Sequence, residues 1–566
     1  MTSPSPQPPQ QKESVSPAPE TISTSSLDPI LNRTIPGPCH PGNQGTLTWG
    51  PDGLVAYGCN SVVVVVDPAS VQVLQCLSKH KTPVCQVAWS HHLDNRRLVL
   101  ASADTSGQII SWDVASGEFV KIVSDGNLEI RDLVWVGDCH LLAVHPPNHL
   151  VLWDMMTGAK IWKKSYGDTI LGMDVSPFKP DTLLLRCQQS FLLTEFSLEK
   201  CPKSDGKKFY MVNNNRHSSV SEGGQRKSRN KLRKMVRSMM LGDVGGDGDG
   251  GGGPGGDDGG GDNDSVLAVF HPGVRGQVLI GYTREVIIVD MELGQAVGQI
   301  NFDRSNSGLV GMRVASQKPV LYLLHESGSV SVWQYKEGLT VASTPMVGMT
   351  SSVSMSSMSS VVQDNPLLEL TYECLTVSDH IRLAKNCQVS GLCIKPSTQT
   401  ELCLLTTDGR LMMMSLRPVS QSWDIPQPPI LTLSSLSTDQ SLKLNVTAVL
   451  PALGQAKCIK MCPPLTTKNL ASYRPLMAVG TVSGNVQVVN VSTGMVEREV
   501  AVHSSPALGL EWTSSNPAVS LLSHTWSTVT GNVSGIVRNE LLHVNIITGK
   551  VSYLSHLSNY KTIDFV

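Results

Sequence analysis

The sequence lacks features that would mark a membrane-spanning or nucleic-acid-binding protein. No apolar run approaches the roughly 20 residues that a spanning helix needs, and the longest β-branched run, at 62–66, has the length of a strand. Its 45 basic and 47 acidic residues nearly balance. A balanced charge creates no general attraction to nucleic acids or membranes. We therefore expect no direct nucleic-acid binding and only peripheral membrane association.

Motifs for catalysis and cofactor binding are also missing. The sequence has no nucleophile elbow and no Cys-His-Asn set, and its glycine-rich run lacks the Gly-Lys-Ser/Thr ending of a phosphate loop. The 13 cysteines are scattered singly, which is typical of a reducing compartment. Cys458 and Cys462 have no second pair at zinc-finger spacing. The sequence predicts a cytoplasmic protein that is not an enzyme and that holds no cofactor or metal.

The sequence does contain a repeated motif. An apolar run is followed by Trp-Asp or a substitute, and then, within a few residues, by a small residue that is usually glycine. The first three acidic positions, Asp67, Asp113 and Asp154, are 46 and 41 residues apart, which is the period of a WD40 blade. Six copies can be read: VVVVVDPAS (62–70), IISWDVASG (109–117), LVLWDMMTG (150–158), VIIVDMELG (286–294), VQVVNVSTG (486–494) and LLHVNIITG (541–549).

The second repeat contains residues that could form a buried polar network. His80, Ser102 and Trp112 are placed to hydrogen-bond inside the blade, with Asp104 as a fourth member, because a buried imidazole and indole each need a partner. Trp153 holds the tryptophan position of the next repeat. A catalytic His-Ser-Asp set is the alternative interpretation. It is disfavoured because other repeats carry Val, Asn or Phe at these positions.

The repeat predicts an all-β fold, a WD40 β-propeller with one seven-bladed ring followed by the first two blades of a second, incomplete propeller. We expect the segment 30–37 to close the ring by pairing with the last blade as its outer strand. Two blades cannot close a ring, so we expect the chain to be a fragment, a short isoform or an incomplete gene model. The predicted domains are a Pro/Ser-rich disordered tail (1–29), the first propeller (30–420) with a disordered insertion (201–264) and a loop (339–365), a connector (421–450), and the truncated second propeller (451–566).

A basic cluster within the insertion is the strongest candidate for a binding patch. Seven cations within twelve residues could bind phosphates, anionic lipid or a nuclear import receptor. The alternative is a solvated loop, partly neutralised by the Gly/Asp-rich stretch that follows it. The cluster comprises Arg226, Lys227, Arg229, Lys231, Arg233, Lys234 and Arg237.

Four segments resemble the WD repeat-containing protein 11 family. They are LVAYGCNSVVVVVD (54–67), LASADTSGQIISWDVASG (100–117), HPPNHLVLWDMMTGAKIWKKSY (145–166) and, most specifically, MCPPLTTKN (461–469). The resemblance runs from about Leu47 to the end, outside the two insertions.

The resemblance implies a scaffold function. The family has two seven-bladed propellers and a helical region, and it works in a complex that helps golgins capture endosome-derived vesicles at the trans-Golgi network. It is also linked to ciliogenesis and Hedgehog signalling. The implied partners are other subunits of a vesicle-tethering complex and golgin-associated proteins, at the trans-Golgi network, cytoplasmic vesicles and the cilium. A signalling or nuclear adaptor that binds a transcription factor is the alternative.

Overall fold

The computed structural model describes most of the chain outside its tail and long insertions. The described residues are 35–90, 99–188, 190–210, 267–302, 307–338, 369–379, 381, 383, 387–419, 441–462, 475–513, 520–529 and 536–558. The predicted tail (1–29), the loop at 339–365 and the basic cluster at 226–237 lie outside these residues.

The described chain forms nine four-stranded antiparallel sheets, each built from consecutive strands. Sheet 1 contains β1 (Leu47–Trp49), β2 (Val55–Cys59), β3 (Val62–Asp67) and β4 (Gln72–Ser78). Sheet 2 contains β5 (Val84–Trp89), β6 (Val99–Asp104), β7 (Gln108–Asp113) and β8 (Glu118–Ser124). Sheet 3 contains β9 (Asp132–Val136), β10 (His140–His145), β11 (His149–Asp154) and β12 (Ala159–Ser165). A short 3-10 helix, η2 (Pro41–Asn43), precedes β1.

Four further sheets follow in the same order. Sheet 4 contains β13 (Ile170–Val175), β14 (Thr182–Cys187), β15 (Ser190–Glu195) and β16 (Lys207–Tyr210). Sheet 5 contains β17 (Leu267–Phe270), β18 (Gln277–Gly281), β19 (Glu285–Asp290) and β20 (Gln295–Asn301). Sheet 6 contains β21 (Leu309–Val314), β22 (Val320–His325), β23 (Val330–Gly338) and β24 (Glu369–Val377). Sheet 7 contains β25 (Val389–Ile394), β26 (Glu401–Thr406), β27 (Leu411–Pro418) and β28 (Leu442–Leu450).

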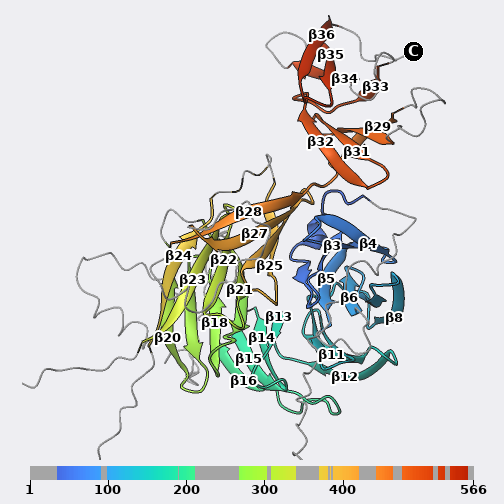
Figure 1. Ribbon diagram of the computed structural model, residues 1–566. Coiled ribbons are helices and arrows are strands. Elements are labelled where there is room, and N and C mark those ends of the chain that lie inside the picture. The colour runs from blue at the N-terminus through green and yellow to red at the C-terminus, as the bar shows by residue number, and fades with distance from the viewer. Residues whose placement is uncertain are drawn as a thin grey trace, which may run out of the picture.

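The last two sheets pack against each other. Sheet 8 contains β29 (Ala456–Met461), β30 (Leu476–Thr481), β31 (Asn485–Asn490) and β32 (Met495–Ala501). Sheet 9 contains β33 (Gly509–Trp512), β34 (Ser520–Val529), β35 (Ile536–Asn545) and β36 (Val551–Ser558). They share an apolar cluster that includes Leu476, Val488 and Trp512. Figure 1 shows them projecting from the seven earlier sheets.

Residue pattern explains the place of each strand within its sheet. The second and third strands carry runs of Val, Leu and Ile that are buried, as in β3, because both faces of the sheet meet neighbouring sheets. The fourth strands, such as β4 and β8, are mostly exposed or half-buried, because they lie at the outer edge. The acidic residue of the repeat ends the third strand and caps the following turn. Asp154, for example, accepts a hydrogen bond from the Met156 amide at 2.8 Å.

The first seven sheets form a closed ring (Figure 1). Their first strands lie innermost, since contacts join the first strands of sheets 1 to 5, those of sheets 6 and 7, and β25 to β1. Sheets 5 and 6 meet through their outer strands, β20 and β24. Two backbone hydrogen bonds fix this closing seam: the Gly45 amide donates to the Ser390 carbonyl at 2.9 Å, and the Cys39 amide to the Thr407 carbonyl at 3.0 Å. Ring closure therefore depends on contacts between segments more than 340 residues apart in the sequence.

The strand pairing corrects three sequence-based boundaries. The outer strand of sheet 7 is β28, which pairs with β27, and not the segment 30–37. The predicted connector at 421–450 therefore contributes its last nine residues to the first propeller, which extends past residue 420. The predicted insertion at 201–264 begins too early, because β16 pairs with β15 as the outer strand of sheet 4. The sequence did not predict β16 and β28, because each is separated from the preceding strand of its sheet by more than ten residues without a repeat motif.

Candidate functional site

The structure brings four of the five predicted network residues together inside sheet 2. The two ring nitrogens of His80 reach different partners: Nδ1 lies 2.9 Å from Asp104 Oδ2 and Nε2 lies 2.7 Å from Ser102 Oγ. The indole N–H of Trp112 donates to Ser102 Oγ at 2.7 Å. The Asp104 carboxylate can only accept, so Nδ1 donates to it, and in a neutral imidazole Nε2 then accepts from the serine hydroxyl.

This network is enclosed and has no route to a substrate. The side chains of His80 and Asp104 are 0% and 1% exposed, and Ser102 is fully buried. Burial raises the pKa of Asp104, but hydrogen bonds from His80, Ser106 and the Gln108 amide outweigh it, and the pKa lies below its ordinary value. The Asp104 carboxylate stays charged and holds the imidazole of His80 in place. The arrangement ties two strands, β6 and β7, to the loop that precedes β5 instead of activating the serine.

Trp153 holds the equivalent position in sheet 3 without the network. It lies opposite Leu141 just as Trp112 lies opposite Leu100, and it is 4% exposed. Ala143 replaces the serine that Trp112 uses, so within the described residues the Trp153 indole N–H has no hydrogen-bond partner. Trp153 is therefore a packing residue in the same slot.

Sheet 6 contains a rearranged network that the repeat analysis missed. Ser331 Oγ accepts from the Trp333 indole at 2.9 Å and lies 2.7 Å from His325 Nε2. Here the histidine comes from the second strand and the serine from the third, whereas sheet 2 takes its serine from the second strand. The sequence feature that could have predicted this network is Ser331, which lies two residues before Trp333. Sheet 9 keeps one contact, between His503 Nε2 and Ser523 Oγ at 2.9 Å.

Charged side chains also gather on the innermost strands of sheets 3, 4 and 6. Asp132 accepts from the Met173 amide at 2.8 Å, and Asp174 accepts from the Phe270 amide at 2.6 Å. Each carboxylate therefore links its own sheet to the next one around the ring. Arg186 and Arg313 lie close enough to favour the charged form of Asp132.

Burial dominates the ionisation of both carboxyl groups. It raises the pKa of Asp132 to about 6 in spite of the amide hydrogen bonds and the two arginines. It raises the pKa of Asp174 to about 6 as well, and the neighbouring Asp132 adds to this shift. Gly172 lies beside the cluster, where a Cβ would be at ordinary van der Waals distance from Asp132 Oδ2, 3.4 Å, and from Arg186 Nη2, 3.5 Å. The two carboxylates link consecutive sheets of the ring, and burial keeps the pKa of each above its ordinary value.

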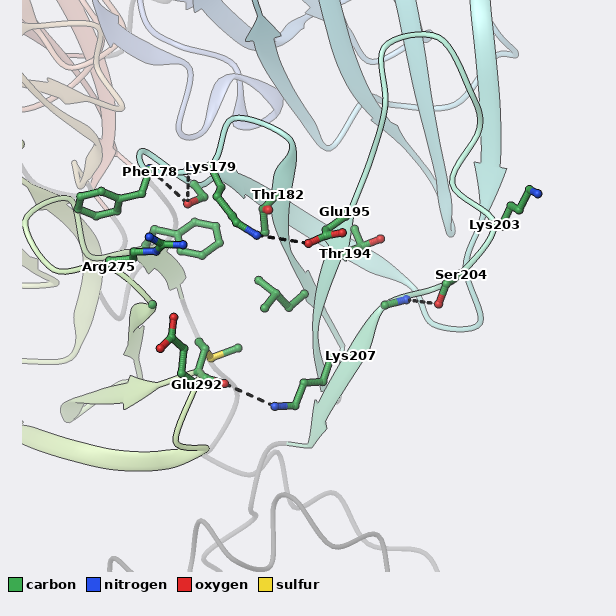
Figure 2. A pocket seen from close by; sticks show the side chains of 16 residues that line it. Phe178, Lys179, Thr182, Thr194, Glu195, Lys203, Ser204, Lys207, Arg275 and Glu292 are labelled. Atoms are coloured by element: carbon green, nitrogen blue, oxygen red, sulfur yellow. Dashed lines mark hydrogen bonds and ion pairs between the residues drawn. The ribbon is translucent and has the colours of Figure 1, made fainter. Parts of the chain in front are cut away.

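A cleft of about 610 Å³ opens between sheets 4 and 5. Its floor includes Leu193, Phe270 and Met291, and Figure 2 shows Phe178 and Arg275 side by side at one end. Lys179 pairs with Glu195 at 3.5 Å, and Lys207 donates to the Met291 carbonyl at 3.5 Å. The volume is in the range of ligand-binding clefts, and the lining combines an apolar floor with charged walls.

In the described part of the chain, no group of three or more His, Cys, Asp or Glu side chains is arranged to hold a metal ion. Nor does any described segment form a helix with the length and apolarity needed to span a bilayer. The basic cluster at 226–237 lies outside the described residues, so the structure does not place it.

Comparison with known proteins identifies homologues of the chain. A model of the first β-propeller of WDR11 matches residues 37–197. WD repeat-containing protein 11 of Mus musculus and that of Homo sapiens are each 32% identical over 582 residues, which cover 92% of this chain and 45% of the relative. Over 92% of its length, the chain is a homologue of WD repeat-containing protein 11. The predicted resemblance and the predicted all-β propeller fold are thereby confirmed.

The chain spans about half the length of the WD repeat-containing protein 11 relatives that it matches. The zebrafish relative gives the same result, with 32% identity over 583 residues. Among solved structures, the C-terminal WD40 domain of Sif2 is 14% identical with a TM-score of 0.42, covering 68% of this chain and 97% of that domain. The WD40 fold is an architecture for protein interaction, and its loops carry the variable binding residues.

Proposed function

We propose that this chain is a non-catalytic scaffold that binds proteins in the tethering of endosome-derived vesicles at the trans-Golgi network. Homology to WD repeat-containing protein 11 supports this role. The proposed partners are other subunits of a vesicle-tethering complex and golgin-associated proteins. The proposed locations are the cytoplasm, the trans-Golgi network, cytoplasmic vesicles and the cilium, where the same scaffold serves ciliogenesis and Hedgehog signalling.

The observation that supports a non-catalytic role most directly is the burial of the His80–Ser102–Asp104 set. A catalytic serine must reach its substrate, but Ser102 is fully buried and accepts a hydrogen bond from Trp112. The ring of seven sheets instead offers loops at both ends and strand edges around its rim. Those surfaces suit binding.

Depletion and rescue test the proposal. Cells depleted of the protein should lose capture of endosome-derived vesicles at the trans-Golgi network, and expression of this chain should restore it. A destabilised ring variant such as Gly409→Ala should restore less. Undiminished vesicle capture after depletion would contradict the proposal.

The alternative is a signalling or nuclear adaptor that binds a transcription factor. The observation that favours it is the run of seven cations at 226–237, which is similar to a nuclear import signal. Deletion of 226–237 should abolish nuclear entry if the adaptor role is correct. Unchanged nuclear access would remove the sequence feature on which this alternative depends.

A further inference from the structure

Sheets 8 and 9 are attached to the ring by a short connector, residues 451–455, that runs from the end of β28 to the start of β29 (Figure 1). Gln487 of β31 holds this connector against sheet 8 and is 2% exposed. Its Nε2 donates to the Ala452 carbonyl at 3.0 Å, and its Oε1 accepts from the Gly454 amide at 2.7 Å. A buried amide side chain whose donor and acceptor both bond to one backbone segment fixes that segment in place.

A second segment, residues 36–39, contacts the connector from the ring side, and we call it the strap. The Leu453 amide donates to the Pro36 carbonyl at 2.9 Å. A Cβ on Gly37 would lie 3.4 Å from the Leu453 carbonyl oxygen, which is ordinary van der Waals contact. Since the connector residues on both sides of Leu453 bond to sheet 8, the connector is held between the strap and sheet 8.

The strap is also part of the closing seam of the ring. The Cys39 amide donates to the Thr407 carbonyl at 3.0 Å, and the Cys59 thiol lies 3.3 Å from the Gly37 carbonyl oxygen. Cys59 ends β2 of sheet 1, and Thr407 follows β26 of sheet 7. The strap therefore bonds to the two sheets that close the ring and to the connector that carries sheets 8 and 9.

The turn between β26 and β27 contacts the strap and the connector at the same point. A Cβ on Gly409 in this turn would lie 3.0 Å from the Ala452 Cβ and would also collide with the Gly37 carbonyl oxygen. Displacement of the strap would therefore uncover the connector, and displacement of the connector would remove support from the strap. Contacts that share one segment open as a unit.

We infer that the strap makes opening of the ring seam and release of the connector that orients sheets 8 and 9 one cooperative event. This conformational device goes beyond the proposed scaffold function and does not depend on it. A partner that displaces the strap would open the seam and free sheets 8 and 9 together. A partner that binds the closed arrangement would stabilise both contacts, because coupling between two sites is reciprocal.

Hydrogen exchange of the full chain, resolved to single amides by mass spectrometry, tests this inference. The Cys39 amide reports on the strap at the seam through its bond to Thr407. The Gly454 amide reports on the connector through its bond to Gln487. A protected amide exchanges when its hydrogen bond opens, so its rate measures how often each contact is released.

Pro36→Asp perturbs the strap, and Gln487→Leu perturbs the grip of sheet 8 on the connector. Pro36 is buried, so an unpaired carboxylate there should displace the strap. Exchange of the Gly454 amide should then become about tenfold faster or more. Gln487→Leu removes both bonds to the connector, and exchange of the Cys39 amide should become about threefold faster or more.

Each variant has a matched control in sheet 1. Pro68→Asp makes the same change in the turn between β3 and β4. Gln75→Leu removes a glutamine that is 4% exposed and whose Nε2 donates to the Val114 carbonyl at 3.3 Å. Both controls should leave exchange of the Cys39 and Gly454 amides unchanged.

Faster exchange at the amide remote from each substitution supports the inference. If each variant speeds exchange only at the amide beside it, the two contacts are independent and the inference is overturned. If Pro36→Asp also speeds exchange throughout sheets 2 and 3, the ring has unfolded and Gln487→Leu decides, since an unchanged Cys39 amide would then overturn the inference. These outcomes do not involve vesicle capture, so they are distinguishable from failure of the proposed function.

Discussion

The carbonyl oxygen of Gly37 lies against Gly409, where a Cβ would stand only 2.1 Å away. Gly409 is in the turn between β26 and β27, and its φ is +86. On the other side of the same segment, the Leu453 amide donates to the Pro36 carbonyl at 2.9 Å. The first described residues are therefore held between two parts of the chain that flank sheet 7, and this contact completes the closing seam.

Gly409→Ala should open this seam. The substitution adds the cost of a positive φ, about 1–2 kcal/mol, to a backbone collision, so we expect a total loss of about 3 kcal/mol in the free energy of unfolding. Gly53→Ala is the matched control, because Gly53 has φ +87 with no atom within 4 Å of its Cβ position. Thermal melting of the full chain measures both. Equal losses in the two variants would show that the Gly37 contact does not matter.

Trp112 and Trp153 should respond differently to removal of the indole N–H alone. Replacement by alanine should cost about 3–5 kcal/mol at either site because both rings are buried. Replacement by phenylalanine should cost about 1–2 kcal/mol more at Trp112, because only that indole donates to a described side chain, Ser102. Chemical denaturation of the two phenylalanine variants tests this, and a larger loss at Trp153 would contradict the assigned network.

The carboxyl of Asp174 should make stability fall as pH rises. Burial raises its folded-state pKa from 3.8 to about 6, so the folded state binds the proton more tightly than the unfolded state. This contribution is present below pH 3.8 and is lost as pH rises through 6. Asp174→Asn retains an oxygen for the Phe270 amide and has no charge to bury. The variant should be more stable than wild type at pH 7.5, on the order of 1–3 kcal/mol, with the difference vanishing near pH 4.

Asp154 is a control whose pKa is shifted in the opposite direction, so its effect on stability should have the opposite pH dependence. The Thr157 hydroxyl donates to its carboxylate at 2.7 Å and, together with two backbone amides, lowers the pKa of Asp154. Its contribution is present above pH 3.8 and is lost as the pH falls through the lowered folded-state pKa. Asp154→Asn should therefore be less stable than wild type at pH 7.5. Melting temperatures measured from below pH 3.8 to pH 8 compare the two variants, and parallel profiles would contradict the opposite signs assigned to Asp154 and Asp174.

Asp125 should stabilise the seam between sheets 2 and 3 in a salt-dependent way. It follows β8 and pairs with Lys160 at 2.8 Å and Lys163 at 2.9 Å on β12. Burial raises its pKa, but the two lysines outweigh burial and lower the pKa to about 2. Asp125→Ala should lower stability by about 0.5–1 kcal/mol in dilute buffer and by less in 1 M NaCl, because exposed pairs are screened. A loss that does not change with salt would indicate a packing effect.

The sequence alone determined the repeat, its strands and the network of sheet 2. The reason is local: His80, Ser102 and Trp112 lie on one loop and two strands joined by a short turn, so their spacing fixes their register. The same logic failed for sheet 6. There the histidine, His325, lies on the second strand and the serine, Ser331, on the third, whereas sheet 2 takes its histidine from a loop and its serine from the second strand. The same logic also missed β16 and β28, which are short or distant partners of strands that carry the repeat signal.

Only the tertiary structure decided which residues on different sheets contact one another. The Gly37–Gly409 contact, the pairing of Asp174 with the Phe270 amide and the cleft around Arg275 join residues that lie 96 or more positions apart, or on different sheets. Local spacing cannot fix such contacts, because they arise only when the ring closes and the sheets are stacked. The sequence by itself determined the strands of each blade, and the stacking of the blades decided where charge is buried and where a cleft opens.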